Sequence, residues 1–307
     1  MLTDLTNTTT GEIRAALAKT RDQMGGPATG VVLNLIIVTD ESGQHDAVRA
    51  ASQAGREHPC RVLAVIARDA RSTSRLDAEI RSGEGTPGQT VLLRLYGPMS
   101  EHADSVIMPL LVPDTPVVTW WHGLIPAVPS AQPLGLLAQR RVTDAARARA
   151  PAEALAALSA GYKPGDTDLS WTRATPWRSL LAATVDQELD DIFGGVVLAE
   201  EHNPTADLLT AWLSSRLKAP FTRETSAGPG ITEVRFATTG GDVVISRPDG
   251  RVATLSRPGQ PDRHVALQRR DIADLLAEEL RRLDPDEIYG EALESLEAVA
   301  GIPAAPG

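Results

Sequence analysis

Four strand-like runs of the sequence end in polar residues that could bind a ligand. The runs cover 31–38, 60–67, 91–97 and 115–121, and the polar ends are Thr39-Asp40-Glu41, Arg68-Asp69, Tyr96-Gly97 and Trp121-His122. Open parallel sheets bind ligands beyond the carboxyl ends of their strands. A dinucleotide site would need a G-x-G-x-x-G turn after the first strand, and this chain has VTDESGQHD instead. A sugar-phosphate- or nucleotide-binding α/β protein, with or without weak enzymatic activity, is therefore only the alternative hypothesis.

Side-chain catalysis would need a nucleophile, a base and an orienting group in a recognisable arrangement. His58, His102 and His122 lie near acidic residues in the first half, but no G-x-S-x-G turn accompanies them. The sequence has no H-E-x-x-H, EF-hand or paired-histidine spacing. Cys60 is the single cysteine, so the chain cannot form an internal disulfide, and a thiol opening an apolar strand is usually inert. We expect no enzyme activity and no catalytic, cofactor-binding or metal-binding residue.

Aromatic and charged side chains are concentrated in two segments, TPVVTWWH (115–122) and GDTDLSWTRATPWR (165–178). Tryptophan and arginine dominate protein interfaces because they bury large flat surfaces. The same side chains could fill a seam between two domains, and the sequence leaves both interpretations open. The candidate residues are Trp120, Trp121, His122, Asp166, Asp168, Trp171, Arg173, Trp177 and Arg178. Because Trp121 is nearer the carboxyl end of its strand, we expect it to be the outer residue of the pair.

The composition excludes several classes of partner. The chain has 307 residues and a formal net charge of −10, which disfavours both nucleic acid and anionic membrane surfaces. The first residues, MLTDLTNTTTGEIR, include acids and no apolar core, so they do not resemble a secretory signal. No apolar run approaches the ~20 residues of a membrane-spanning helix. We therefore expect a cytoplasmic protein.

The pattern of elements predicts an α/β fold. Strand-like and helical segments alternate through the first half, which is typical of a parallel, Rossmann-like sheet. TTGE (9–12) has the form of a capping box, while 102–111 and 133–141 look helical and 67–90 has no firm assignment. The second half predicts a mixed sheet with an antiparallel meander and C-terminal helices. We place an N-terminal α/β domain at residues 1–160 and a C-terminal α/β domain at 161–307.

Several long motifs resemble those of the OpcA family, the glucose-6-phosphate dehydrogenase assembly proteins of bacteria. They are REHPCRVLAVIARD (56–69), LDAEIR (76–81), HADSVIMPLLVPDTP (102–116), DTPVVTWWHG (114–123), PLGLLAQRRVTDAA (133–146) and GDTDLSWTRATPWR (165–178). The resemblance implies a non-enzymatic accessory subunit. Such a subunit binds glucose-6-phosphate dehydrogenase, promotes its active oligomer and activates it allosterically in the oxidative pentose phosphate pathway. Photosynthetic relatives are linked to thiol-based control, but Cys60 alone cannot form an internal dithiol switch.

Overall fold

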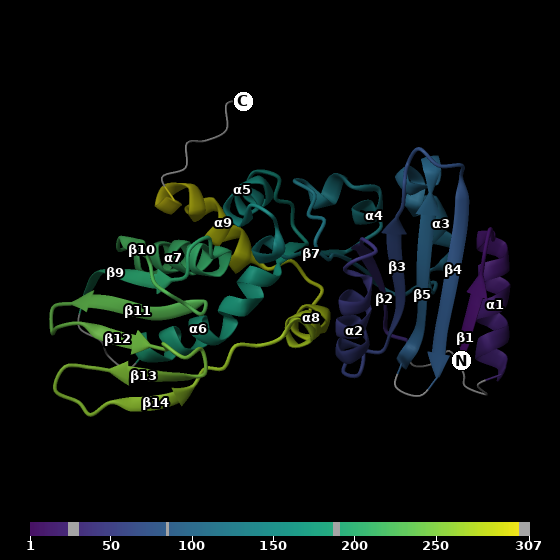
Figure 1. Cartoon of the computed structure of the whole chain (residues 1–307). Helices are drawn as coiled ribbons and strands as arrows, with labels where there is room; N and C mark the ends of the chain where they lie inside the picture. The colour runs from purple at the N-terminus through teal and green to yellow at the C-terminus, as the bar shows by residue number, and fades with distance from the viewer. Residues whose placement is uncertain (24–30, 84–85, 187–190, 301–307) are drawn as a thin grey trace. The chain divides into compact units, whose positions relative to one another are not determined.

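The computed structural model describes residues 1–23, 31–83, 86–186 and 191–300 (Figure 1). The chain folds into two compact units, each with its own sheet. The first unit comprises Met1–Asp144, Gly165–Thr167 and Asp271–Pro285, and the second comprises Ala145–Pro164, Asp168–Arg270 and Asp286–Gly307. Neither unit is one continuous segment. The expected division into an N-terminal domain at residues 1–160 and a C-terminal domain at 161–307 stays a prediction.

The described strands of the first unit form an eight-stranded sheet. Its order is β1 (Leu2–Leu5), β4 (Arg75–Gly83), β5 (Thr86–Tyr96), β3 (Cys60–Ala67), β2 (Leu33–Thr39), β6 (Val117–Trp121), β7 (Arg140–Thr143) and β8 (Asp166–Asp168). The pairs β5–β3, β3–β2, β2–β6 and β6–β7 are parallel, whereas β1 and β4 pair antiparallel. The parallel strands have the 3-2-1-4-5 order of Rossmann folds, which confirms the predicted parallel-rich sheet.

The central strands of this sheet are buried on both faces. Leu63 and Val65 of β3 belong to a core cluster with α1 (Thr10–Gln23) and α3 (Ala103–Ile107). Intervening residues of the same strand point to the other face, where α2 (Gln44–Ala54) packs against β2, β3 and β5. Burial on both faces explains why the sequence of β3, CRVLAVIA, is almost continuously apolar.

Helix α8 (Ile272–Arg281) belongs to the first unit although it lies near the end of the sequence. It packs against α2, and Figure 1 shows the two helices side by side. Asp271 caps α8 by accepting a 3.0 Å hydrogen bond from the Asp274 amide. Within the unit, Glu279 of α8 forms a buried ion pair with Arg140 of β7, with 2.5 Å between Nη2 and Oε2. This pair connects the segment Asp271–Pro285 to strand β7 of the sheet.

Three expectations for the first unit are wrong or incomplete. The predicted helix 133–141 is limited to α4 (Pro133–Leu136), because Arg140–Thr143 pairs with β6 as β7. The predicted helix 102–111 is broken into α3, between the 3₁₀ turns η1 (Gly97–His102) and η2 (Met108–Leu110). The segment 67–90 contains β4, which pairs antiparallel with β5. A further 3₁₀ turn, η3 (Pro129–Ala131), precedes α4.

The described strands of the second unit form a six-stranded mixed sheet. Its order is β10 (Phe221–Thr225), β9 (Ile192–Ala199), β11 (Ile231–Thr238), β12 (Val243–Ser246), β13 (Val252–Ser256) and β14 (Arg263–Ala266). Only β9–β10 is parallel among these pairs, because α7 (Pro204–Leu217) connects the two strands as a crossover. Strands β11 to β14 form the predicted antiparallel meander.

The helical segments of the second unit lie between residues 145 and 300. They are η4 (Ala145–Arg147), α5 (Pro151–Ala160), α6 (Leu169–Val185), α7 and α9 (Glu287–Ala300). Helix α6 runs through Pro176, which cannot donate a hydrogen bond to the carbonyl of Thr172. The guanidinium of Arg270 donates to that carbonyl instead. A replacement donor therefore lets one continuous helix form through the proline.

Candidate functional site

The carboxyl ends of β2 and β6 meet in the first unit, as the sequence predicted. Val38 pairs with Trp121, and the amide of His122 donates a 2.9 Å hydrogen bond to the carbonyl of Val38. The chain reaches β3 and β5 on one side of β2, and β6 and β7 on the other. This reversal of strand order is where Rossmann folds bind their ligands.

The turn after β2 is closed by the carboxylate of Asp40. Its Oδ1 accepts hydrogen bonds of 2.7 Å from the Ser42 hydroxyl and 2.7 Å from the Gly43 amide. These two bonds hold the pKa of Asp40 below its ordinary value, and the bond from Ser42 has the larger effect. A Cβ on Gly43 would lie 2.8 Å from Thr39 Oγ1, so the turn is also tightly packed. The amide that would face a phosphate at the start of α2 is thus bound to the chain's own acid.

Ion pairs occupy the neighbouring strand ends. Glu41 lies 3.0 Å from Arg68 and 3.6 Å from Arg94. Arg94 also donates a 3.0 Å hydrogen bond to the side-chain oxygen of Gln44. The guanidinium of Arg75 stacks 4.0 Å from the ring of Tyr96. The cations at this edge are therefore engaged with the chain's own acids, amides and aromatic rings.

The TWWH segment is buried inside the first unit. Trp120 is 0% exposed, Trp121 4% and His122 3%. Trp121, the expected outer residue of the pair, is therefore nearly as buried as Trp120. The rings of Trp120 and His122 make an edge contact with 5.0 Å between centroids. Gly135 is required beside Trp121, because a Cβ there would lie 3.2 Å from the indole and 1.9 Å from the Pro129 carbonyl oxygen. These residues have packing roles, and their assignment to a partner interface or seam stays a prediction.

The two predicted aspartates both serve the local structure. Asp166 forms a buried ion pair with Arg141 in the first unit. Asp168, which is 0% exposed, accepts 2.8 Å hydrogen bonds from the amides of Ser170 and Ala145 in the second unit. Asp168 is therefore the N-cap of α6 and also holds the start of η4.

Trp171 is held on several sides within the second unit. Its indole N–H donates a 2.8 Å hydrogen bond to Asp286, and the guanidinium of Arg178 lies 3.7 Å from its ring. The ring of Tyr289 packs against it with 5.8 Å between centroids. The structure thus brings Trp171 and Arg178 together, at the junction of α6 with α9.

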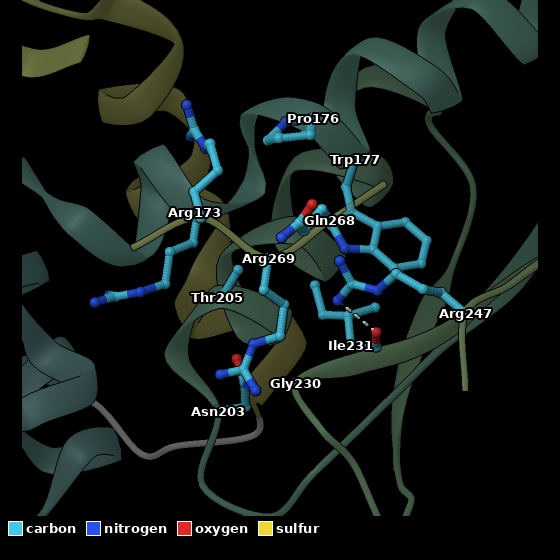
Figure 2. Close-up of a pocket in the computed structure, with 11 residues that line it drawn as sticks. Arg173, Pro176, Trp177, Asn203, Thr205, Gly230, Ile231, Arg247, Gln268 and Arg269 are labelled. Carbon is cyan, nitrogen blue, oxygen red and sulfur yellow. Dashed lines mark hydrogen bonds between the residues drawn. The ribbon is translucent and has the colours of Figure 1, made fainter. Parts of the chain in front are cut away.

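Trp177 and Arg173 line a small pocket in the second unit. Its volume is about 70 Å³, and its wall combines α6, the start of α7 and the segments that flank the meander. Figure 2 shows Arg269 extending toward Asn203 and Gly230, while Arg247 lies beside Trp177. The described residues that line it are Arg173, Pro176, Trp177, Asn203, Thr205, Gly230, Ile231, Arg247, Gln268, Arg269 and Arg270.

The inner wall of this pocket carries a buried cation. Arg247 is 5% exposed and donates 2.9 Å hydrogen bonds to the carbonyls of Leu267 and Ile231. Its guanidinium lies 4.9 Å from the ring of Trp177. Burial, followed by the neighbouring charge of Arg269, lowers the pKa of Arg247 to about 10. The pocket is therefore electropositive in a chain whose net charge is −10.

Sequence reasoning missed this pocket apart from Arg173 and Trp177. Its arginines come from positions 173, 247, 269 and 270, so no local spacing joins them. The available signals were the Asn203-Pro204 pair, which has the form of a helix start, and the adjacent arginines of QRR (268–270). Asn203 does cap α7, because its side chain accepts a 3.1 Å hydrogen bond from the Ala206 amide.

Solved structures resemble the chain only distantly. A variant of KijD10, a 3-ketoreductase from Actinomadura kijaniata, is 13% identical with a TM-score of 0.47, over 88% of this chain and 96% of that one. An NAD-binding oxidoreductase from Klebsiella pneumoniae is 10% identical with a TM-score of 0.43, over 88% and 96%. An oxidoreductase from Sinorhizobium meliloti is 10% identical with a TM-score of 0.42, over 87% and 89%. Likeness at this level carries no inference about function.

Two family models match the chain, one in each half. The N-terminal domain of the glucose-6-phosphate dehydrogenase subunit matches residues 51–160, and the C-terminal domain of that subunit matches residues 164–293. The chain therefore belongs to a class of proteins built from these two domains in succession. That family is OpcA, as the sequence motifs predicted. No curated protein matches the chain. Within its described residues, no helix is both long and apolar enough to span a membrane.

Proposed function

We propose that the chain is an accessory subunit without chemistry of its own, which binds glucose-6-phosphate dehydrogenase in the cytoplasm. In this proposal it promotes the active oligomer of the enzyme and activates it allosterically in the oxidative pentose phosphate pathway. The observation that carries the proposal is the pair of family matches to the dehydrogenase subunit, over residues 51–160 and 164–293.

The ligand end of the first sheet is consistent with a binding role. Asp40 takes up the Gly43 amide after β2, and Glu41 is paired with Arg68. A dinucleotide phosphate would need such amides and cations free. Because these groups are already bound within the chain, the geometry supports a role for the fold in binding a partner rather than a dinucleotide.

Activation places a thermodynamic condition on the complex. The subunit can shift the enzyme only by the difference between its affinities for the competent state and for the other states. Allosteric coupling is typically about 1–3 kcal/mol, which corresponds to roughly 5- to 150-fold in an apparent affinity. Allosteric coupling is reciprocal, so a ligand that prefers the active state of the enzyme should also increase the affinity of the enzyme for the subunit.

The test mixes the purified chain with its partner dehydrogenase and measures co-elution and the substrate saturation curve. We expect a complex on sizing and a shifted curve, compared with an unrelated acidic protein of similar charge as a control. A second arm adds the chain to pre-formed dehydrogenase tetramers, where allosteric activation still predicts a gain. No gain there would restrict the role to assembly. Absence of both complex and activation across salt and substrate concentrations would refute the proposed function.

A further inference from the structure

The start of α7 presents unused donors to the pocket described above. Pro204 has no amide hydrogen, and the Ala206 amide is taken by the cap residue Asn203. Thr205 lies between them and is 7% exposed. Neither its amide nor its hydroxyl bonds to another described residue, and it lines the pocket. Amide and hydroxyl donors that have no protein partner can bind an acceptor, so this end of the helix favours an acceptor ligand.

Two guanidinium groups flank the same opening. A Cβ on Gly230 would lie 3.6 Å from Arg247 Nη2 and 3.8 Å from Arg269 Nε. Gly230 has a φ of +65°, so its left-handed conformation and lack of a side chain keep this approach open. The Arg269 side chain is exposed and forms no hydrogen bond or ion pair with the described residues. A planar guanidinium can donate two parallel hydrogen bonds to a phosphate group.

The nearby acids do not neutralise this charge at the opening. Asp207 in the first turn of α7 is 3.0 Å from Arg223, and Glu200 accepts a 3.1 Å hydrogen bond from Asn203. No Asp or Glu among the described residues lines the pocket. The positive end of the α7 dipole adds to the attraction for an anion.

The volume limits what can enter. Pockets for whole cofactors or drug-sized ligands measure ~300–1,000 Å³, whereas this pocket measures about 70 Å³. A single phosphate group can occupy such a space, while the rest of its molecule lies outside, near the exposed Gln268. A phosphomonoester carries about −1.5 to −2 charges at neutral pH, which matches two facing guanidinium groups.

We propose that this pocket binds the phosphate group of a small phosphomonoester. The phosphate oxygens accept hydrogen bonds from the amide and hydroxyl of Thr205 and from the guanidinium of Arg269, with Arg247 behind them. The inference is independent of the dehydrogenase, since it rests on the second unit alone.

The test titrates the whole chain with glycerol 3-phosphate, inorganic phosphate and uncharged glycerol, using calorimetry at matched ionic strength. We expect saturable binding of glycerol 3-phosphate and of phosphate, and none of glycerol. Arg269→Gln should weaken binding of glycerol 3-phosphate about tenfold or more, the effect of losing one charge-assisted hydrogen bond. Thr205→Val should weaken it as well. The matched control is Arg263→Gln, which removes the same charge from an exposed position of β14 and should leave binding unchanged.

Three outcomes would overturn the proposal. The first is the absence of saturable binding by either phosphate compound. The second is equal binding by wild type, Arg269→Gln and Thr205→Val, provided that all three are folded by circular dichroism. The third is binding of inorganic phosphate but not of glycerol 3-phosphate, because the pocket would then exclude an ester.

Discussion

The indole N–H of Trp171 donates a 2.8 Å hydrogen bond to the carboxylate of Asp286, which joins α6 to the start of α9. The other oxygen of Asp286 accepts a 3.1 Å hydrogen bond from the amide of Tyr289, so the same acid caps α9. Trp171 is only 1% exposed. A residue singled out as a candidate for partner binding thus has a defined role inside the second unit.

Replacing Trp171 by Phe should destabilise the second unit. The substitution removes the hydrogen bond to the half-buried Asp286 carboxylate, and a hydrogen bond to a charged group typically contributes about 1.5–3 kcal/mol. It also removes ring area under Arg178. Urea denaturation followed by circular dichroism would measure the loss, with Ser179→Ala on the exposed side of α6 as the control. Unchanged stability together with a lost dehydrogenase complex would instead place Trp171 on the partner surface.

Substitution of Asp168 by Asn should be far more harmful than the same change at Asp271. Each carboxylate oxygen of Asp168 accepts a hydrogen bond from a backbone N–H. In asparagine one of these oxygens is replaced by an NH₂ group, which would face a backbone N–H donor. Among the described residues, the exposed side chain of Asp271 accepts one hydrogen bond, from the Asp274 amide. Asn caps helices as well as Asp does. We expect Asp168→Asn to lower the free energy of unfolding by about 1–3 kcal/mol and Asp271→Asn to leave it nearly unchanged. Equal effects in thermal unfolding would contradict the buried double cap.

Glu279→Gln should destabilise the first unit. Arg140 and Glu279 are 5% and 6% exposed at their side chains, and removing one charge leaves the other buried without compensation. Losing one partner of such a pair costs roughly 3–5 kcal/mol. Chemical denaturation would measure the change, with exposed Asp274→Asn on the same helix as the control. A loss no larger than that of the control would mean that the Arg140–Glu279 pair does not stabilise the first unit.

Cys60 should be unreactive in the folded chain. It is 0% exposed, and burial raises the pKa of its thiol from 9.0 to about 12. The thiolate is the reactive form, so iodoacetamide should label Cys60 only after unfolding. Rapid labelling of the native chain, detected by mass spectrometry, would contradict this burial.

The same shift predicts a dependence of stability on alkaline pH. The folded chain holds the Cys60 proton more tightly than the unfolded chain does. Its contribution to stability is therefore complete below pH 9.0 and is lost as the pH rises toward about 12. Wild type should lose stability more steeply than Cys60→Ala across that interval in urea titrations. Parallel pH profiles would show that this thiol titrates normally.

The sequence predicts those elements whose burial leaves a local pattern. Strand β3 coincides with the almost continuously apolar run 60–67. The Thr9–Glu12 capping box also forms, with 2.8 Å between the Thr9 amide and the Glu12 carboxylate. Strand β4 also had a readable pattern, because Leu76, Ala78 and Ile80 alternate and are buried. The surrounding Arg, Ser and Gly residues obscured that pattern.

Other features depend on contacts between distant segments. Residues 140–143 follow a Leu-, Ala- and Gln-rich stretch that favours a helix, but pairing with β6 makes them a strand. The arginine pocket has no local pattern, since Arg173, Arg247 and Arg269 come from α6 and from both sides of the last two meander strands. Sequence periodicity does not report which distant residues will share a cavity.

The return of α8 to the first unit has a consequence for the order of biosynthesis. A ribosome delivers the residues of β2, β3, β5 and β6 first and Asp271–Pro285 only after nearly the whole second unit. Domains generally fold as units during synthesis, but here the first unit must wait with one face of α2 uncovered and Arg140 without Glu279. Translation of a chain truncated before residue 271 would arrest the molecule in that waiting state. In such a truncated chain all strands of the second sheet are present, whereas the first unit lacks α8.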